Sequence, residues 1–281
     1  MCRFYFYLSK KNVKIPIGTM LNDKNKHSIW TQATIRIRNH SDIDRMSDEI
    51  KEELVDTMTS SVQGEGYGFY LFDKKFLYKQ MSLPAHDYNM NDLMSLESSS
   101  FYGHIRASST SPCSVNVHPF RYNGKYDYTY TLCHNGGISG NYKHYLHASC
   151  DYNLMANSDT GYAFNYMLSY LDDLPEQHFS RFDGTCLVDA FNYLVDSIRE
   201  NAKDLRHSLN FALSDNKHLA ILRYSHNMPC FVICKRETDD LIEFASEPTD
   251  NFESWDPLPQ NSVTLIKLED MTYSVLEFKG V

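Results

Sequence analysis

Hydrophobic residues follow two different spacings along the chain, and these spacings predict where its strands and helices lie. Residues 3–8 form a short run rich in aromatic side chains, which predicts a strand at the start. Residues 9–44 are polar and irregular, whereas apolar residues recur every four positions over 44–60 and predict an amphipathic helix. Further strands are expected at 69–72, 101–107 and 128–133, and helices at 160–171 and 186–202.

The pattern changes after Leu205, where short apolar runs follow one another between turn residues. Strands at both ends of the chain, with helices in the middle, predict an α+β fold in which two sheets pack and helices cover them. No linker, repeat or low-complexity tract interrupts the sequence, so residues 1–281 are expected to form a single domain. The late strands are expected at 209–213, 218–224, 230–235, 241–245, 263–268 and 273–278.

Composition narrows the class of protein. With 42% hydrophobic and 22% charged residues, the 281-residue chain is typical of a globular protein with a sizeable core. A net charge of −9 disfavours nucleic acid as the main ligand and gives no reason to expect an anionic membrane partner. The sequence has neither an apolar run long enough to span a membrane nor a signal-peptide pattern. Seven cysteines without a framework spacing indicate reduced thiols and a cytoplasmic location.

Cys2 follows the initiator methionine, and its position gives it a chemical possibility that internal cysteines lack. Methionine aminopeptidases remove Met1 when the second residue is small. The freed α-amino group has a pKa well below that of a lysine, so near neutrality it can accept the proton of the thiol. Cys2 is therefore a candidate nucleophile that carries its own base.

The segment from His134 to Ile138 contains Asn135-Gly136-Gly137 in a chain with only 12 glycines, directly after a predicted strand. The backbone must turn sharply or approach another group closely there. An asparagine NH₂ beside a glycine N–H can form an oxyanion hole, in which two fixed donors stabilise the charge on an attacked carbonyl. Asn-Gly is also the commonest signal for a two-residue hairpin turn, so both interpretations stay open.

Two charged residues complete the candidate site. Arg106 ends a predicted strand before small residues and can grip a carboxylate through two parallel hydrogen bonds, or it is an ordinary surface arginine. Asp159 can hold an ammonium group, or it caps the helix that follows. A carboxylate clamp, an ammonium partner and an oxyanion hole together describe a pocket for an α-amino acid whose side-chain carbonyl is attacked. With Cys2 as nucleophile, the substrate would be a γ-glutamyl amide.

These motifs make the chain resemble the class II glutamine amidotransferases, and among them the stand-alone branch that includes the fungal glutathione-degrading amidotransferase subunit. The resemblance extends from residue 1 to about 268, with the motifs in order and sensibly spaced. The matching segments are Met1-Cys2-Arg3-Phe4, Gly64-Glu65-Gly66-Tyr67-Gly68-Phe69, Gly103-His104-Ile105-Arg106-Ala107-Ser108, His118-Pro119-Phe120, His134-Asn135-Gly136-Gly137-Ile138-Ser139, Ser158-Asp159-Thr160, and Ala245-Ser246-Glu247-Pro248 with Trp255 and Pro257.

The resemblance implies an N-terminal-nucleophile (Ntn) hydrolase with a four-layer αββα sandwich of two mainly antiparallel sheets covered by helices. It implies hydrolysis of glutamine or of a γ-glutamyl peptide such as glutathione through a Cys2 thioester, without a metal or organic cofactor. It also implies a separate synthetase or peptidase partner subunit. The roles that it implies are Cys2 as nucleophile, Asn135 and Gly136 as oxyanion hole, Arg106 and Asp159 as substrate-binding residues, and Gly66 and Tyr67 as the wall around Cys2.

The sequence departs from the family at Glu65, where an aspartate is common, and at Gly161, where an acidic residue is common. These departures are the basis of an alternative function, a catalytically silent binding or regulatory subunit that keeps the fold. His226, Cys230 and Cys234 are spaced by four residues as metal ligands can be, but no fourth ligand is evident and their segment looks like a strand. We therefore expect no metal site.

Overall fold

The computed structural model of the protein describes residues 2–21, 28–34, 66–81, 87, 89–107, 113–148, 152, 156–175, 183–250 and 254–278. The helix expected over 44–60 lies outside these residues, as does Glu65. The chain divides into two compact units, Met1–Pro119 with Phe231–Leu258 and Phe120–Cys230 with Pro259–Val281. The two units interleave along the sequence, so neither is a continuous segment. That residues 1–281 form a single domain stays a prediction.

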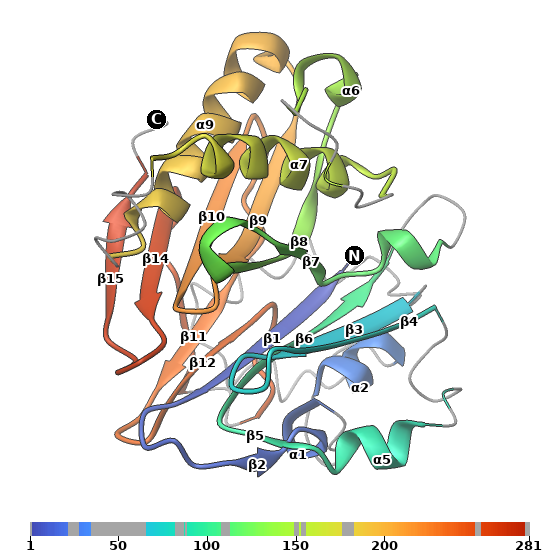
Figure 1. The fold of residues 1–281 in the computed structure, drawn as a ribbon, viewed down its shortest axis with the longest axis vertical. Helices are drawn as coiled ribbons and strands as arrows, with labels where there is room; N and C mark the ends of the chain where they lie inside the picture. The colour runs from blue at the N-terminus through green and yellow to red at the C-terminus, as the bar shows by residue number, and fades with distance from the viewer. Residues whose placement is uncertain are drawn as a thin grey trace. The chain divides into compact units, whose positions relative to one another are not determined.

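The first unit contains a seven-stranded sheet in the order β13-β11-β12-β1-β6-β3-β4, in which all pairs are antiparallel (Figure 1). A two-stranded sheet of β2 and β5 lies beside short helices. The strands are β1 (Arg3–Ser9), β2 (Ile15–Pro16), β3 (Gly66–Leu71), β4 (Phe76–Gln80), β5 (Glu97–Ser98), β6 (Ser100–Arg106), β11 (Cys234–Glu237), β12 (Leu241–Ala245) and β13 (Asp256–Pro257). The helices are α1 (Gly18–Leu21), α2 (Ile29–Thr34), α5 (Met90–Met94) and the 3₁₀ turn Ser114–Asn116.

Strand β1 lies in the middle of this sheet, and all seven of its residues are buried. Alternate side chains belong to opposite faces. Tyr5 and Tyr7 share a core cluster with Leu21 and Ile29 from α1 and α2. On the other face Phe6 stacks on Tyr102, with ring centroids 4.8 Å apart. Each such buried side chain stabilises the fold by about 1.5–3 kcal/mol. The residue next to Cys2 therefore begins a firmly anchored strand.

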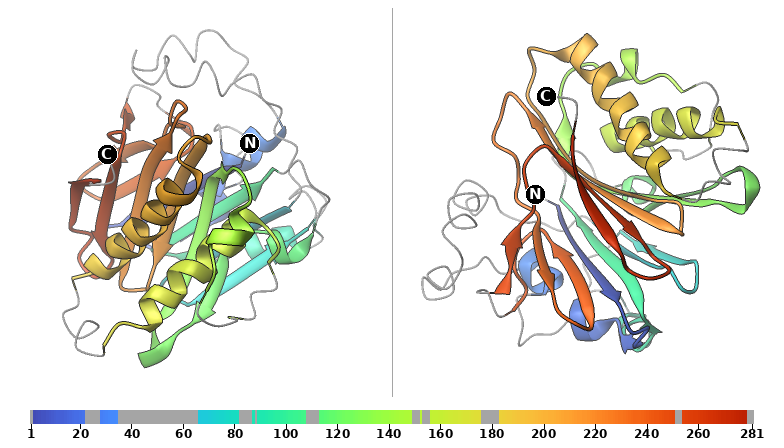
Figure 2. Two further views of the ribbon diagram at one scale, coloured as in Figure 1. Left: turned by 90° about the horizontal axis from the view of Figure 1, so that it is seen from above. Right: turned by 90° about the vertical axis from the view of Figure 1, so that its left-hand side faces the viewer.

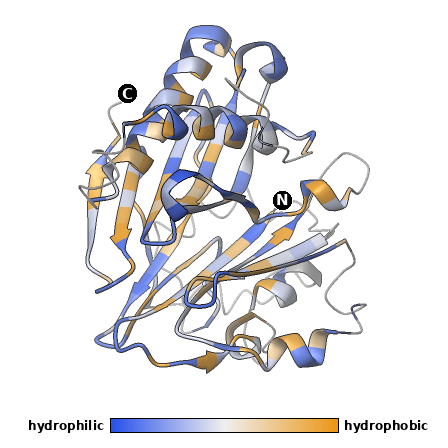
Figure 3. Ribbon diagram, viewed as in Figure 1, coloured by the Kyte–Doolittle hydropathy of each residue, from blue (hydrophilic) through white to orange (hydrophobic). Residues whose placement is uncertain are grey.

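The second unit contains a six-stranded antiparallel sheet in the order β15-β14-β10-β9-β8-β7, and Figure 2 shows α7 and α9 on one of its faces. Apolar positions of both helices pack on alternate residues of the strands, and Figure 3 shows polar and apolar bands alternating along α9. The strands are β7 (Phe120–Asn123), β8 (Thr129–Ile138), β9 (His207–Ser214), β10 (His218–His226), β14 (Ser262–Lys267) and β15 (Tyr273–Glu277). The helices are α6 (Tyr142–Tyr145), α7 (Asp159–Asp172), α9 (Thr185–Ala202) and the 3₁₀ turn Lys125–Asp127.

The expected α+β class with two mainly antiparallel sheets is confirmed, as are the two long helices and most strands. Three local predictions are wrong. Residues 9–44 are not uniformly irregular, because they include α1 and α2, whose apolar residues cover the first sheet. The strand expected at 230–235 begins only at Cys234, since the apolar residues before it are buried without forming a ladder. The late strands also do not all follow one another through turns, because β11 and β12 belong to the first sheet whereas β9, β10, β14 and β15 belong to the second.

Candidate active site

Cys2 lies at the N-terminal end of β1 and is 9% exposed. Its Sγ is 3.4 Å from both the main-chain nitrogen and the carbonyl oxygen of Ala107, the residue that follows β6. The thiol donates to the carbonyl oxygen, and the amide N–H donates to the sulfur. The main chain at the end of β6 thus fixes the position of the Cys2 sulfur at the start of β1.

Arg106 belongs to the same end of the same sheet. Arg3 pairs with Ile105, so alternation places Cys2 and Arg106 on one face. Arg106 ends β6, pairs with Gly66 across the ladder and is 6% exposed. A Cβ on Gly66 would lie 2.6 Å from Val117 Cγ2 and 2.9 Å from the carbonyl oxygen of Gln80. Glycine is therefore required for close packing at the position opposite Arg106. The structure brings Cys2, Arg106 and Gly66 together within the first unit.

Tyr67 differs, because its side chain lies on the opposite face. It pairs with Ile105 and packs edge-on against Trp30, and its hydroxyl donates to the carboxylate of Asp87. Burial, together with the hydrogen bond and negative charge of Asp87, raises the pKa of Tyr67 far above its ordinary value. Burial alone would raise the pKa of Asp87, but hydrogen bonds from Tyr67 and Tyr78 lower it. Tyr67 can border the Cys2 face only through its main chain.

The start of β1 is also held from the other side, by the segment that follows β12. Ser246 Oγ accepts from Phe4 N at 3.0 Å, and Ser246 N donates to Phe4 O at 3.1 Å. Arg3 forms a buried ion pair with Glu247, and Arg3 Nη1 donates to the carbonyl oxygen of Cys2 at 3.0 Å. The segment around Ser246 and Glu247 thus anchors the start of β1. Sequence reasoning assigned these residues no role, although the match at 245–248 was the signal available.

In the second unit, Asn135 and Gly136 lie within β8 rather than in a turn. Asn135 pairs with Asn210 and Gly136 with Leu209 of β9. The hairpin-turn interpretation is therefore wrong, because β9 supplies a partner strand along this whole segment. The close approach expected for glycine is present. A Cβ on Gly136 would lie 2.0 Å from the carbonyl oxygen of Ser208 and 2.7 Å from His134 Nε2.

His134 explains part of this crowding. Its Nε2 is 3.0 Å from the Ser208 carbonyl oxygen and its Nδ1 is 2.9 Å from Thr160 Oγ1, while its ring stacks on Phe211. Because a carbonyl oxygen only accepts, Nε2 carries the hydrogen and Nδ1 accepts from the Thr160 hydroxyl. Burial lowers the pKa of His134, and the negative charge of Asp159 offsets only part of that effect. The neutral imidazole thus ties the strand that carries Asn135 to helix α7.

Asp159 lies at the start of α7, half-buried, and adjoins the end of β8. Its Oδ2 accepts from Ile138 N at 2.9 Å, and its Oδ1 accepts from Thr160 N at 2.8 Å. The expected N-cap role is wrong, because Ser158 is the cap and its hydroxyl accepts from Gly161 N at 3.2 Å. A carboxylate in the first turn of a helix is favourable with the helix dipole. The second unit therefore brings Asp159 next to the Asn135-Gly136-Gly137 strand end.

The departure at Gly161 has a local packing reason. A Cβ there would lie 2.6 Å from Ala156 Cβ and 3.0 Å from the Ala156 carbonyl oxygen. Any side chain at this position would displace the segment that precedes the helix. Glycine at 161 thus allows the segment before the helix to pack closely against its first turn.

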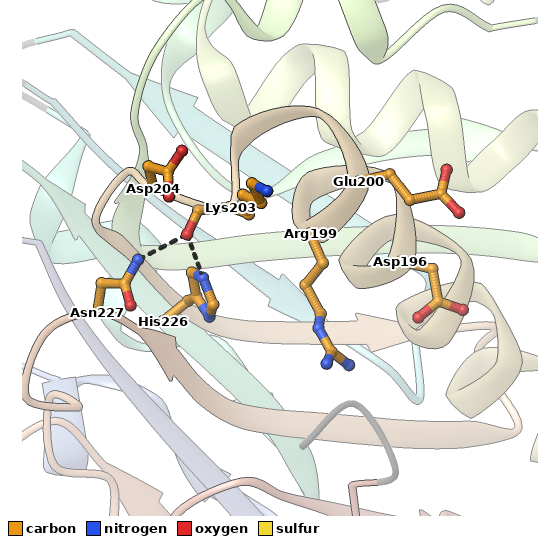
Figure 4. A pocket seen from close by; sticks show the side chains of 7 residues that line it. All are labelled: Asp196, Arg199, Glu200, Lys203, Asp204, His226 and Asn227. Atoms are coloured by element: carbon orange, nitrogen blue, oxygen red, sulfur yellow. Dashed lines mark hydrogen bonds between the residues drawn. The ribbon is translucent and has the colours of Figure 1, made fainter.

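Two other features of the described residues concern metal binding and a pocket. No cluster of three or more His, Cys, Asp or Glu side chains there could hold a metal ion. A pocket of about 550 Å³ lies at the end of α9 (Figure 4), where His226 Nε2 and Asn227 Nδ2 both donate to the carbonyl oxygen of Lys203 at 2.7 Å. These bonds satisfy the C-terminal end of the helix. Its lining carries charges of both signs: Asp196, Arg199, Glu200, Lys203, Asp204, His226 and Asn227.

Two histidines of the motifs quoted above lie close together in the first unit. His118 Nδ1 is 3.1 Å from His104 Nε2, so the two rings form a hydrogen bond. The helices in the described part of the chain include none long and apolar enough to cross a membrane.

Comparison with known proteins identifies the fold. Neither a protein-family model nor a curated protein matches the sequence. Among solved structures, a glutamine aminotransferase class-II domain protein from Silicibacter pomeroyi is similar over 99% of each chain, with a TM-score of 0.58 and 16% identity. The structure of the allosteric regulatory enzyme of purine biosynthesis is similar over 98% of this chain and 48% of its own, with a TM-score of 0.55 and 14% identity.

At these identities the likeness shows the fold. The chain has the α+β fold of these proteins, and the predicted fold class is confirmed. The chain spans about half the length of the purine enzyme, so the activity of that whole protein does not carry over to this chain.

Proposed function

We propose that the protein is a class II glutamine amidotransferase of the Ntn-hydrolase type, which hydrolyses a γ-glutamyl amide bond. One observation supports this most directly. The thiol of Cys2 is fixed by the main chain of Ala107, and Arg106, the residue before it, lies on the same face of the sheet. A nucleophile beside a guanidinium is the arrangement needed to attack the side chain of an amino acid whose α-carboxylate is held.

In the proposed reaction, Met1 is removed and the α-amino group of Cys2 takes the proton of the thiol. The sulfur attacks the side-chain carbonyl carbon, and the tetrahedral intermediate expels ammonia, or an amine if the substrate is a peptide, with that proton. A thioester of glutamate remains on Cys2. Water then attacks the thioester, the amino group again acting as base, and glutamate leaves as the thiol is restored.

The other residues take the roles that the resemblance implies. Asn135 and the N–H of Gly136 stabilise the oxyanion, for which a lost donor typically costs about 3 kcal/mol. Arg106 binds the α-carboxylate of the substrate and Asp159 its α-ammonium group. The hydrogen bonds of Asp159 to Ile138 N and Thr160 N support this role, because they hold its carboxylate beside the Asn135-Gly136 strand end. Gly66 contributes to the wall around Cys2 by keeping the main chain close.

The substrate is glutamine or a γ-glutamyl peptide such as glutathione, in a cytoplasmic setting. Glutamine would serve to supply ammonia to a separate synthetase subunit, whereas glutathione would be degraded together with a peptidase partner. All six cysteines in the described part of the chain are thiols, which supports a reducing compartment. The reaction itself needs no metal or organic cofactor.

The experiment measures glutamate released from glutamine and from glutathione by protein whose Met1 removal is confirmed by intact mass. Cys2→Ala should abolish release, whereas the matched control Cys113→Ala, which removes a partly exposed thiol of the same unit, should not. Arg106→Lys keeps the positive charge but cannot form two parallel hydrogen bonds to the substrate carboxylate, so KM should rise. Release that persists at the wild-type rate in Cys2→Ala would refute the nucleophile. Binding of glutamine without any turnover by the processed protein would favour the silent subunit instead.

A further inference from the structure

The carbonyl oxygen of Cys2 is fixed by an ion pair. Arg3 Nη1 donates to it at 3.0 Å, and the same guanidinium is paired with the carboxylate of Glu247. The two side chains are only 5% and 6% exposed. A buried arginine and carboxylate are costly to desolvate, so a gain in stability does not by itself account for an ion pair at this depth.

The stereochemistry of Cys2 shows what the pair can control. Three heavy-atom substituents leave its Cα: the side chain, the carbonyl group and the amino nitrogen. The sulfur is held by the main chain of Ala107, and the carbonyl oxygen is held by Arg3. Fixing two substituents of a tetrahedral carbon fixes the direction of the third. The third is the amino nitrogen, the proposed base.

We propose that Arg3 and Glu247 are positioning residues that orient the α-amino base of Cys2 toward its thiol. This inference rests on the proposed function. Glu247 orients the guanidinium and balances its positive charge, so that the amino group can still bind a proton near neutrality. Ser246 supports the arrangement, because it bonds both main-chain groups of Phe4 and so locks the register of the segment that carries Glu247.

The same sheet offers a matched control. Glu243 of β12 is fully buried, pairs with Arg236, and accepts a hydrogen bond from Tyr5 of β1. Glu247→Gln and Glu243→Gln therefore each remove the charge of a buried glutamate that faces an arginine and supports β1. Only Glu247 is linked to Cys2 through its arginine. Comparing the two variants therefore distinguishes an effect on the stability of the protein from an effect on the orientation of the Cys2 amino group.

The first test uses the full chain with Met1 removed and compares glutamate release from glutamine. Glu247→Gln should lower kcat by roughly 10- to 100-fold and change KM by less than about 3-fold, because a small misplacement of a catalytic group affects the reacting geometry rather than substrate binding. It should also move the acidic limb of the kcat/KM profile to lower pH, since an unbalanced guanidinium disfavours the protonated amine. Arg3→Lys should give an intermediate kcat, because an ammonium group cannot serve both partners as a guanidinium does.

A second measurement does not depend on turnover. The rate of Cys2 alkylation by iodoacetamide is followed against pH in wild type, Glu247→Gln and Glu243→Gln, with the modified residue located by peptide mass. The proposal predicts a shifted profile in Glu247→Gln alone. Wild-type kcat and an unshifted profile in folded Glu247→Gln, or equal changes in Glu243→Gln, would overturn it. If wild type releases no glutamate, the proposed function fails, and the alkylation profiles still decide whether the pair governs Cys2.

Discussion

The two glycines after Asn135 should respond very differently to an added methyl group. A Cβ at Gly136 would lie 2.0 Å from the Ser208 carbonyl oxygen and 2.7 Å from His134 Nε2. A close carbon–oxygen contact is about 3.3 Å, so the neighbouring strand would have to move by about 1.3 Å. At Gly137 the nearest heavy atom is Asp159 Oδ2 at 3.9 Å, an ordinary contact.

The expected magnitude follows from these contacts. Overpacking of a well-packed site costs about 1–3 kcal/mol, and a lost hydrogen bond such as that from His134 to Ser208 adds about 0.5–1.5 kcal/mol. Gly136→Ala should therefore destabilise the protein by about 1.5–4.5 kcal/mol, which lowers the melting temperature by roughly 3–18 °C for a chain of this size. Gly137→Ala should stay within about 1 kcal/mol of wild type, because the smaller entropy of the unfolded chain favours alanine.

Thermal and urea unfolding of the two variants, measured side by side, provide the assay. The two substitutions are chemically identical and lie at adjacent positions of β8, so differences in expression or general β-propensity cancel. Equal stability of Gly136→Ala and Gly137→Ala would refute the close approach of β8 and Ser208. It would also remove the physical reason for glycine at 136.

Three further predictions concern His134, Tyr67 and Asp159. Burial lowers the pKa of His134 in the folded protein, so only the unfolded chain gains a proton as pH falls below the ordinary histidine pKa. The free energy of unfolding should therefore decrease by up to about 1.4 kcal/mol per pH unit in that range. Urea unfolding at pH 7.5 and 5.5 should show a smaller decrease in His134→Gln than in wild type. Tyr67→Phe should lower the free energy of unfolding in urea by about 1–2 kcal/mol, because the hydrogen bond to Asp87 is lost. KM for glutamine should stay unchanged, because that bond lies on the face away from Cys2. A raised KM would contradict this placement of Tyr67. Asp159→Asn should raise KM roughly 10- to 100-fold through loss of a charged partner worth about 1.5–3 kcal/mol, and an unchanged KM would exclude the ammonium role. The melting temperature should also fall, because the single amide oxygen can accept from only one of Ile138 N and Thr160 N.

The helices and most strands could be predicted because their signal is local. The apolar spacing of 160–171 and 186–202 follows the helical period, and the short, nearly continuous apolar runs at 3–8 and 241–245 are typical of buried strands. Asn135-Gly136 shows where local signals fail. The dipeptide favours a turn, yet β9 pairs with it from a distant part of the sequence and extends it into a strand.

Much of the candidate site also depends on distant pairing. Cys2 and Arg106 could be proposed from their residue types, but the contact of the thiol with Ala107 follows from the register of β1 and β6. The face occupied by Tyr67 follows from the same register. The ion pair of Arg3 with Glu247 joins residues that are far apart in the sequence, so no local sequence pattern predicts it. Sequence patterns indicate which side chains are available, but the pairing register of the strands determines which of them come into contact.

Glutamate release by the processed chain, compared with Cys2→Ala, tests the central claim most directly. Both proteins are purified, Met1 removal is confirmed by intact mass, and each is incubated with glutamine and with glutathione under identical conditions. The account predicts release by wild type from at least one substrate and none by Cys2→Ala, together with a transient glutamyl adduct on Cys2. Release that does not depend on Cys2, or folded and processed wild type that releases glutamate from neither substrate, would contradict it.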